Sequence, residues 1–352
     1  MNIKITGVGS FIPEKIERNS DFEEHRFLNE DGTAFNQPNA VIIEKFEAIT
    51  GIRERRYLQE ELTNSDIAYF ASERAIEDAG IDAEELDYII VAHNYGDVRH
   101  EGMQSDTVPS IASRVKQKLK IKNPHCVAFD VLFGCPGWIQ AVIQAHAFMK
   151  AGMAKKCLVV GSETLSRVID PHDRDSMIYS DGAGATVLET TEDEGGILAF
   201  EAATFALEEA NFIYFGPSYN KDHTDERRYI KMHGRKIYEF ALNQVPQAMK
   251  ACLEKSGVPI TEVKKILIHQ ANEKMDEAII NRFYRLFGRP APQHIMPMSI
   301  HELGNSSVAT VPTLLDLVLK GKLEGQKLEK GDTIILASVG AGMNINAIVY
   351  KL

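Results

Sequence analysis

The sequence of 352 residues lacks any run of about 18 apolar residues, the length that a membrane-spanning helix needs. The first residues, MNIKITGVGS, lack the basic stretch and apolar core of a secretory signal. We therefore expect a soluble, cytoplasmic protein with no membrane partner. Cysteine is scarce, and none of the four cysteines stands in a CxxC pair or another zinc-binding spacing. This argues against a disulfide scaffold and against a zinc site; the four are Cys126, Cys135, Cys157 and Cys252.

Positive charge is also in the minority, with 39 Lys and Arg residues against 50 Asp and Glu residues and a formal net charge of −11. Such a chain has no overall attraction to nucleic acid or to an anionic membrane surface, so we expect neither as a partner. A local basic cluster could still bind an anionic ligand, although a solvated face explains it equally well. The two clusters are Arg227, Arg228, Lys231, Arg235 and Lys236, and Lys274, Arg282 and Arg285.

Short apolar runs alternate with amphipathic stretches along most of the chain. The runs are typical of strands buried on both faces, and the stretches between them are typical of helices. Strands separated by helices predict an α/β protein with a largely parallel sheet. The predicted strands are 86–92, 125–131, 156–162, 184–189, 264–270 and 333–339, and the predicted helices are 65–79, 137–151, 237–256, 273–287 and 308–320.

The chain also resembles itself, which indicates an internal duplication. Residues 72–94 align with residues 249–271, and residues 133–152 align with residues 303–322, in the same order. Each aligned pair combines the same helix, turn and strand signals. The predicted units are an N-terminal half, 1–190, a connection, 191–234, and a C-terminal half, 235–352.

The alignment places three polar residues at the ends of predicted strands. Cys135 falls opposite Asn305, each where a strand passes into a helix, and His269 ends its strand opposite Ala92. In open α/β sheets, ligands bind beyond the carboxyl ends of the strands. The topology therefore predicts that Cys135, His269 and Asn305 converge on one site.

Cys135 stands in an unusual setting, between Gly134 and Pro136. Proline suits the first position of a helix, so we expect Cys135 to be the N-cap of a helix at 136–150. The positive end of the helix dipole would lower the pKa of the thiol there and make it a nucleophile. Gly134 and Gly137 would allow a sharp turn and the approach of a substrate. We expect the other three cysteines to be structural.

A cysteine, a histidine and an asparagine together suit the chemistry of thioesters. His269 begins the segment HQAN at 269–272, and Asn305 lies in the segment GNSS at 304–307. A neutral imidazole and a carboxamide can both donate hydrogen bonds to a developing oxyanion. Other histidines near the predicted site, at 93, 100 and 301, are expected to be structural.

With these segments, the chain resembles the β-ketoacyl-acyl-carrier-protein synthase III family of the thiolase superfamily. The resemblance runs in order over nearly the whole sequence. It implies a duplicated five-layered αβαβα sandwich, the thiolase fold, and a homodimer. The segments that carry it are ITGVGSFIPE (5–14), TGIRERR (50–56), FGCPGW (133–138), VVGSETLSRVIDPHDR (159–174), SDGAGATVLE (180–189), HQAN, GNSS and VGAGMNINAIVYKL (339–352).

The resemblance implies a catalytic triad of Cys135, His269 and Asn305. Cys135 would take an acyl group from acyl-CoA, and malonyl on acyl-carrier protein would then bind. His269 and Asn305 would stabilise the enolate that forms on loss of CO2, and the carbanion would attack the acyl-cysteine. The main-chain N–H groups of Cys135 and Ala341 would form an oxyanion hole, and no metal, flavin or nicotinamide would be required.

The resemblance also implies substrate contacts. Arg167 matches a nucleotide-contacting arginine, and Val108 stands where a bulky residue often closes the acyl pocket. The residues implied on the pantetheine side are Gly234, Arg235 and Asn272, and those implied in carrier-protein docking are Lys274 and Arg282.

The chain departs from the family pattern at several positions. Lys45 and Ile49 replace the tryptophan and arginine that embrace the CoA nucleotide, and the segments 26–44 and 94–108 look longer. Proline and tryptophan at 136 and 138 replace the usual small residues after the nucleophile. These changes predict a starter larger than acetyl or a specialised pathway.

Several alternatives share parts of this pattern. A degradative thiolase would need a second catalytic cysteine, and only Cys252 lies in the C-terminal half. An elongating synthase would have a second histidine at the place of Asn305. A head-to-head condensing enzyme would need a catalytic glutamate, for which Glu101 is the one loop candidate. An acyltransferase to oxygen or nitrogen, or a non-catalytic partner subunit of another synthase, also remains open.

Overall fold

The computed structural model describes residues 2–102, 104–222 and 226–352, so residue 103 of the predicted longer loop 94–108 and residues 223–225 of the predicted connection lie outside it. The described residues form a five-stranded sheet in the order β1-β7-β6-β4-β5, a four-stranded sheet in the order β11-β12-β13-β8, and two small antiparallel pairs, β2-β3 and β9-β10. The strands are β1 (Asn2–Phe11), β2 (Lys15–Arg18), β3 (Glu54–Tyr57), β4 (Tyr88–His93), β5 (Val127–Leu132), β6 (Lys156–Thr164), β7 (Asp181–Thr191), β8 (Gly196–Thr204), β9 (Ile213–Pro217), β10 (Arg228–Met232), β11 (Val263–Ile268), β12 (Thr333–Gly340) and β13 (Asn344–Lys351).

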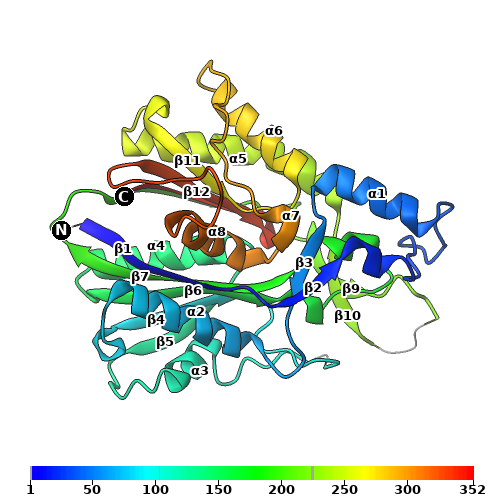
Figure 1. Cartoon of the computed structure of the whole chain (residues 1–352), viewed down its shortest axis with the longest axis horizontal. Helices are drawn as coiled ribbons and strands as arrows, with labels where there is room; N and C mark the ends of the chain where they lie inside the picture. The colour runs from blue at the N-terminus through cyan, green and yellow to red at the C-terminus, as the bar shows by residue number, and fades with distance from the viewer. Residues whose placement is uncertain (1, 103, 223–225) are drawn as a thin grey trace.

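Helices cover both sheets, and two helices lie between them (Figure 1). Helices α2 and α3 cover the outer face of the five-stranded sheet, and α5 and α6 cover the outer face of the four-stranded sheet. Helices α4 and α8 form the middle layer, so the five-layered αβαβα order is confirmed. The helices are α1 (Asn39–Thr50), α2 (Asn64–Ala79), α3 (Ile111–Lys118), α4 (Gly137–Lys150), α5 (Gly234–Ser256), α6 (Glu273–Arg285), α7 (Ile300–Leu303) and α8 (Thr310–Leu319).

The sheets are mixed, so the prediction of a largely parallel sheet is wrong. Strand β4 pairs in parallel with β5 and β6, but β6 pairs antiparallel with β7, and β7 pairs antiparallel with β1. In the second sheet, β11 and β12 are parallel, and β13 pairs antiparallel with both β12 and β8. The parallel neighbours are those that a helical crossover joins, whereas β7 follows β6 without one and returns in the opposite direction.

Strand β5 corrects the expectation that every apolar run is buried on both faces. It is the last strand of its sheet, and the side chains of Val127 and Leu132 are 47% and 70% exposed. The other predicted strands are nearly fully buried, including β11, which is also the last strand of its sheet but bonds along its edge to Ile295. What packs against an edge strand, rather than its composition, therefore determines the burial of β5.

The largest core lies between the two sheets, around the middle helices. Trp138, the only tryptophan of the sequence, is fully buried there on α4 and packs with residues of both sheets and of α8. Separate cores lie beneath α5 and α6 and beneath α2 and α3. We propose the division into halves at 1–190 and 235–352 with the connection 191–234, within which β8 joins the sheet of the second half.

A buried cation ties β10 to the loop that follows β6. The ammonium group of Lys231 lies 2.6 Å from Asp170 and 3.0 Å from Asp173, and all three side chains are buried. Lys231→Met leaves two carboxylates in the interior without their cation, and we expect a loss of about 3–5 kcal/mol in the free energy of unfolding, measured with urea. Lys250→Met, which removes a surface pair with Glu254, is the control and should cost less than about 0.5 kcal/mol. Equal effects of the two variants would contradict this interpretation.

Candidate active site

Cys135 lies in the tight turn between β5 and α4. The main-chain N–H of Gly137 donates to the carbonyl of Gly134 over 2.7 Å, and the N–H of Gln140 donates to the carbonyl of Pro136 over 2.9 Å. Helix α4 therefore begins at Gly137 with Pro136 as its N-cap. The prediction that Cys135 is the N-cap is wrong by one residue, because the first helical hydrogen bond is accepted by the carbonyl of Pro136.

Gly134 serves close packing between the two halves of the chain. A Cβ atom on Gly134 would lie 2.6 Å from the main-chain nitrogen of Ala341, and one on Gly340 would lie 2.5 Å from the main-chain nitrogen of Cys135. Neither glycine has a positive φ. The glycine before the thiol is thus required because the turn at 340–342 packs directly against it, and not by the sharp turn that the sequence suggested.

The three predicted catalytic residues line one cavity of about 70 Å³, which we call the inner cavity. Cys135 enters it from the β5–α4 turn, His269 from the end of β11, and Asn305 from the segment before α8. Ala341 lines the same cavity. The structure therefore brings Cys135 together with two residues that lie more than a hundred positions away from it in the sequence.

The side chain of Asn305 is oriented by its own loop. Its Oδ1 accepts the main-chain N–H of Ser307 over 2.8 Å, and its main chain bonds to Ile178 and Ser180. With the carboxamide oxygen engaged, Nδ2 is the group left to interact with a ligand, and it has no hydrogen-bond partner among the described residues. Asn305 can therefore donate a hydrogen bond to an acceptor in the inner cavity.

His269 is held at the end of β11 by its main-chain N–H, which donates to the carbonyl of Ala337 over 2.9 Å. Burial lowers the pKa of the imidazole to about 4, and Nδ1 is buried without a partner among the described residues. The ring is thus neutral at ordinary pH and still carries one N–H. A neutral donor suits an enolate, because it stabilises negative charge without giving up its proton.

The thiol of Cys135 differs from the sequence prediction in the direction of its pKa shift. Burial raises the pKa to about 11; the hydroxyl of Ser307 lowers it by hydrogen bonding and the charge of Glu163 raises it. The expected lowering of the pKa by the helix dipole is therefore wrong for the free protein, because desolvation of the thiolate outweighs the favourable contacts. The cysteine is a thiol at neutral pH until a ligand or a change of partner favours its ionised form.

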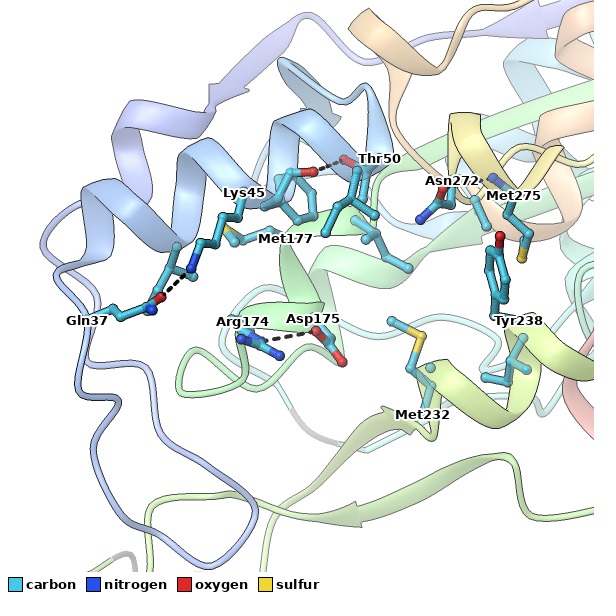
Figure 2. Close-up of a pocket in the computed structure, with 17 residues that line it drawn as sticks. Gln37, Lys45, Thr50, Arg174, Asp175, Met177, Met232, Tyr238, Asn272 and Met275 are labelled. Carbon is cyan, nitrogen blue, oxygen red and sulfur yellow. Dashed lines mark hydrogen bonds and ion pairs between the residues drawn. The ribbon is translucent and has the colours of Figure 1, made fainter. Parts of the chain in front are cut away.

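A second cavity of about 310 Å³, which we call the outer cavity, adjoins the inner one (Figure 2). Both cavities share part of their walls, which places the outer cavity on the approach to Cys135. Gly234 and Asn272 line the outer cavity, as do Lys45 and Ile49, the two departures from the family pattern. The shared residues are Ile178, Met232, Ile237, Ala271 and Met275.

Asn272 combines two roles at the wall of the outer cavity. It is the N-cap of α6, and its Oδ1 accepts the main-chain N–H of Met275 over 3.0 Å. Lys45 and Arg174 supply cationic groups to the same walls, with Asp175 paired to Arg174 over 3.6 Å. The outer cavity is thus mainly apolar with a charged rim.

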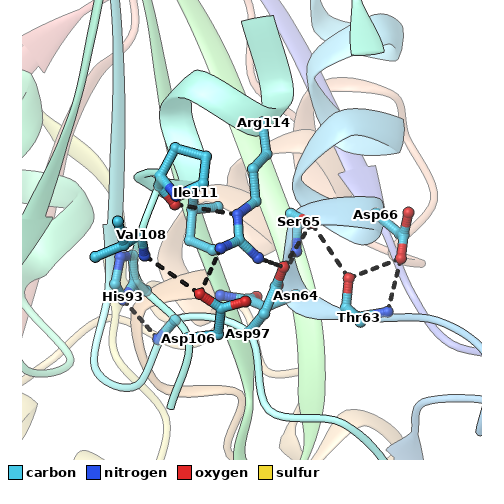
Figure 3. Close-up of polar contacts among 12 residues, drawn as sticks. Thr63, Asn64, Ser65, Asp66, His93, Asp97, Asp106, Val108, Ile111 and Arg114 are labelled. Carbon is cyan, nitrogen blue, oxygen red and sulfur yellow. Dashed lines mark hydrogen bonds and ion pairs between the residues drawn. The ribbon is translucent and has the colours of Figure 1, made fainter. Parts of the chain in front are cut away.

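Two predicted ligand residues lie outside both cavities. Arg167 donates from Nη2 to the carbonyl of Gln59 over 2.8 Å, and its Nε and Nη1 are buried without partners among the described residues. Val108 is 84% exposed on the loop before α3, where its main-chain N–H donates to Asp106 (Figure 3). The structure therefore does not bring either side chain to the thiol of the same chain.

The predicted basic residues lie at the surface. Arg235 pairs with Glu239 one turn along α5 over 2.9 Å, and Lys274 is exposed at the start of α6. Arg282 donates to the carbonyl of Leu242 over 3.1 Å. None of the three side chains lines the inner or the outer cavity, and Arg282 lines a separate pocket between α5 and α6.

Sequence reasoning missed all the apolar residues of the inner cavity except Ala341, and four of its polar ones: Asn94, Tyr95, Tyr179 and Ser307. Asn94 and Tyr95 directly follow β4, so their place at the carboxyl end of a strand was a usable signal. Ser307 follows Asn305 by two residues. Tyr179 had no such signal, because only the bridge between Tyr179 and Asn305 brings it to the cavity.

Within the described residues, no group of three or more His, Cys, Asp or Glu side chains could hold a metal ion. None of the helices in the described ranges is long and apolar enough to cross a membrane.

Comparisons with known proteins agree over the full length of the chain. Residues 129–205 match the family 3-oxoacyl-[acyl-carrier-protein] synthase III, and residues 253–352 match its C-terminal region. The chain is 34% identical to β-ketoacyl-[acyl-carrier-protein] synthase III 1 of Vibrio vulnificus over 97% of each protein, and 29% identical to that of Bacillus cereus over 100% of this chain and 99% of the relative.

Solved structures of this kind superimpose closely on the chain. The synthase III of Aquifex aeolicus has a TM-score of 0.81 at 30% identity, covering 99% of this chain and 100% of that one. The enzyme of Thermus thermophilus has a TM-score of 0.83 at 29% identity, covering 99% of each chain. These likenesses confirm the thiolase fold, and the chain belongs to the β-ketoacyl-[acyl-carrier-protein] synthase III family.

Proposed function

We propose that the protein catalyses the decarboxylative condensation of an acyl thioester with malonyl-acyl-carrier protein, giving a β-ketoacyl product in fatty-acid or polyketide-like synthesis. The observation that carries the proposal is the inner cavity, where one thiol, one neutral imidazole and one free carboxamide N–H meet. The substrates acyl-CoA and acyl-carrier protein are the partners. The carrier-bound substrate brings its own phosphopantetheine arm, and no further cofactor takes part.

The first half-reaction loads the cysteine. The sulfur of Cys135 attacks the thioester carbonyl, and the main-chain N–H groups of Cys135 and Ala341 stabilise the oxyanion. The carbon–sulfur bond to the donor then breaks, and the proton lost by Cys135 is taken up by the departing sulfur. Ala341 suits this role because its main-chain nitrogen packs against the turn that holds the cysteine. The product is an acyl-cysteine in the inner cavity.

The second half-reaction uses the two donors. The malonyl carboxylate leaves as CO2, and the electron pair of the broken bond forms an enolate that His269 and Asn305 stabilise by hydrogen bonds to its oxygen. The enolate carbon attacks the acyl carbonyl, and the sulfur of Cys135 departs. The new carbon–carbon bond uses the electron pair of the bond that was broken on release of CO2, so the reaction needs no external oxidant or reductant.

The outer cavity suits the phosphopantetheine arm. Its apolar walls fit the alkyl parts of the arm, Asn272 and Gly234 can hydrogen-bond to the amides, and Arg235 lies next to them on α5. Lys274 and Arg282 on α6 are the proposed docking residues for the carrier protein. Arg167 stays a proposal for nucleotide contact, and it requires the guanidinium to leave its present carbonyl partner.

We expect starters of six to ten carbons to load faster than acetyl. The inner cavity that holds the thiol is also lined by apolar and phenolic side chains, which include Leu165, Ile213, Ile230, Tyr95 and Tyr179. Intact-mass measurement of the acyl adduct over a chain-length series of acyl-CoA and acyl-carrier donors gives the order of rates. Acetyl loading much faster than all longer donors would contradict the prediction.

A variant in the wall separates pocket size from general damage. Ile213→Trp adds bulk to the inner cavity, so we expect it to lower the loading of the longer donors by about tenfold or more and to change acetyl loading little. Leu207→Trp, at a fully exposed position, is the matched control. A uniform loss over all donors would assign the variant's effect to folding rather than to the pocket.

A homodimer is part of the proposal. The exposed edge of β5 has unpaired main-chain groups and the exposed side chains of Val127 and Leu132, and a second copy can cover them. The loop of Val108 is tied to the same strand, because Asp130 accepts the main-chain N–H of Ile111 over 2.7 Å. Val108 can therefore close an acyl pocket only across the interface, in the second copy.

The alternatives fare differently in this geometry. Cys252 is buried on α5 with its sulfur bonded to the carbonyl of Ala347, which disfavours a second catalytic thiol. Glu101 does not line the inner cavity, which disfavours a head-to-head condensation that uses it in the same chain. An acyltransferase to oxygen or nitrogen would form the same adduct but would release no CO2 from malonyl-carrier protein.

A further inference from the structure

A chain of hydrogen bonds leads from the thiol of Cys135 to a buried carboxylate. The hydroxyl of Ser307 donates to the sulfur of Cys135 over 3.4 Å, and Nδ2 of Asn94 donates to the oxygen of Ser307 over 3.2 Å. The same Nδ2 donates to Oε2 of Glu163. The four residues come from four separate segments of the chain, and only Cys135 takes part in the proposed reaction.

The direction of each bond in this chain follows from the carboxylate at its end. Glu163 is fully buried, and although burial raises its pKa to about 6, it is mostly ionised at neutral pH. A carboxylate can only accept, and its Oε2 also accepts the main-chain N–H of Asn94 over 2.8 Å. The nitrogen of the Asn94 carboxamide must therefore face Glu163.

The orientation of the Asn94 carboxamide determines which group donates a hydrogen bond to the sulfur of Cys135. With one N–H of Asn94 directed to Glu163, the other is directed to the oxygen of Ser307. Ser307 accepts there, so its own O–H is left to donate to Cys135. A donor held in this direction favours the thiolate over the thiol.

We propose that Glu163 is a positioning residue that, through Asn94, orients the hydroxyl of Ser307 as a hydrogen-bond donor to the nucleophilic sulfur. The inference rests on the proposed role of Cys135 as nucleophile and adds three residues to the machinery that supports it. No proton moves along the chain, because each bond keeps its donor. The assignment explains why a carboxylate is buried behind the inner cavity.

A simple charge effect would act in the opposite direction. The negative charge of Glu163 by itself raises the pKa of the Cys135 thiol, whereas the oriented Ser307 hydroxyl lowers it. Removal of the charge alone would therefore favour the thiolate. Loss of the orientation would disfavour it, so the two roles of Glu163 can be separated by the sign of the change.

The experiment compares Glu163→Gln with Glu163→Met. Glutamine carries no charge, but it keeps an oxygen that accepts from Asn94, because the main-chain N–H of Asn94 can only donate. Methionine has a similar shape and is only a weak acceptor. The measurement is the rate of Cys135 alkylation by iodoacetamide from pH 6.5 to 10.5, followed by peptide mass because the other three cysteines are buried. Below the pKa, the rate is proportional to the fraction of thiolate, so the displacement between the profiles of two proteins gives the difference in their thiol pKa values.

We expect the thiol pKa of Glu163→Gln to equal that of the wild type or to lie below it. For Glu163→Met we expect a rise of about one unit, which is about tenfold less thiolate at a fixed pH below the pKa. A lower pKa in both variants would assign Glu163 a charge effect only and would overturn the proposal.

A second pair of variants tests the same chain without touching the buried carboxylate. Ser307→Ala removes the donor to the sulfur, and Ser306→Ala is the matched control because its hydroxyl contacts Thr310 instead. We expect the thiol pKa to rise by about one unit in the first variant only. If Glu163→Met does not fold, this pair of variants tests the proposal on its own. Equal thiol pKa values in the two serine variants would contradict it.

The alkylation profile needs no substrate. Failure of the proposed orientation therefore leaves the condensation reaction untouched as a hypothesis. Failure of the proposed function would instead appear as a missing acyl adduct in the wild-type protein. The two results can be told apart on the same preparation.

Discussion

Cys135→Ala should abolish the acyl adduct and lower condensation by more than about 10³-fold, because covalent catalysis has no route without the sulfur. No other cysteine can take over, since the three that remain are buried. Intact-mass measurement after incubation with an acyl donor detects the adduct directly, and product assays give the rate. We expect the variant to fold normally, because Cys135 lies at the wall of a cavity and not in a core.

Cys252→Ala is the matched control for this experiment. Its thiol is buried on α5, far from the cavity wall, so the adduct and the condensation rate should both stay close to those of the wild type. An adduct that persists in the Cys135 variant, or one that disappears in the Cys252 variant, would place the nucleophile elsewhere. A non-catalytic partner subunit would give no adduct in any of the three proteins.

His269→Ala and Asn305→Ala should each lower the decarboxylation of malonyl-carrier protein by about 10²–10³-fold, the usual cost of one lost donor to an oxyanion. Loading of Cys135 should change far less, since neither side chain belongs to the proposed oxyanion hole of that step. Release of CO2 and formation of the acyl adduct, measured separately, distinguish the two half-reactions.

The pKa of His269 adds a pH dependence to this prediction. Because burial lowers that pKa to about 4, the imidazole stays a neutral donor as the pH falls to about 5 and gains a proton only below that. The decarboxylation rate should therefore show no loss from His269 between pH 5.5 and 8. An acid limb near pH 6.5 that disappears in His269→Ala would show that the ring titrates normally and would contradict the assignment.

His301→Ala is the control for the histidine variant. That imidazole bonds to Glu273 over 2.9 Å and lies outside the inner and outer cavities. Decarboxylation that survives in both His269→Ala and Asn305→Ala would refute the roles proposed for these two side chains. A loss of similar size in the His301 variant would point to general destabilisation instead.

Much of the fold was predictable from local patterns. The apolar runs at 156–162 and 333–339 became β6 and β12, the internal repeat predicted a duplication, and the resemblance to the family implied two sheets with helices between and around them. The pairing partners were harder to predict, because β1, β8 and β13 carry no helical crossover signal and join their sheets antiparallel. Chain direction in a sheet depends on the connections, which a strand's own composition does not record.

The candidate site was also predictable only in part. The positions of Cys135, His269 and Asn305 followed from the repeat and from the ends of the predicted strands. The state of the thiol did not, because its pKa depends on burial and on Ser307 and Glu163, which come from elsewhere in the chain. Arg167 shows the reverse case: it matches the family pattern, but in this structure it bonds to a main-chain carbonyl and lines neither cavity, so its contact with a nucleotide stays a prediction.

By itself, the sequence determined that this chain is a duplicated α/β protein and that a cysteine, a histidine and an asparagine lie at the ends of strands. These features depend on periodicity and on turn residues, which act over a few positions. Only the tertiary structure decided that β5 is an exposed edge, that the cysteine is a desolvated thiol, and that Glu163 lies behind it. Burial and hydrogen-bond direction are set by what packs against a residue from distant parts of the chain, and no local pattern contains that information.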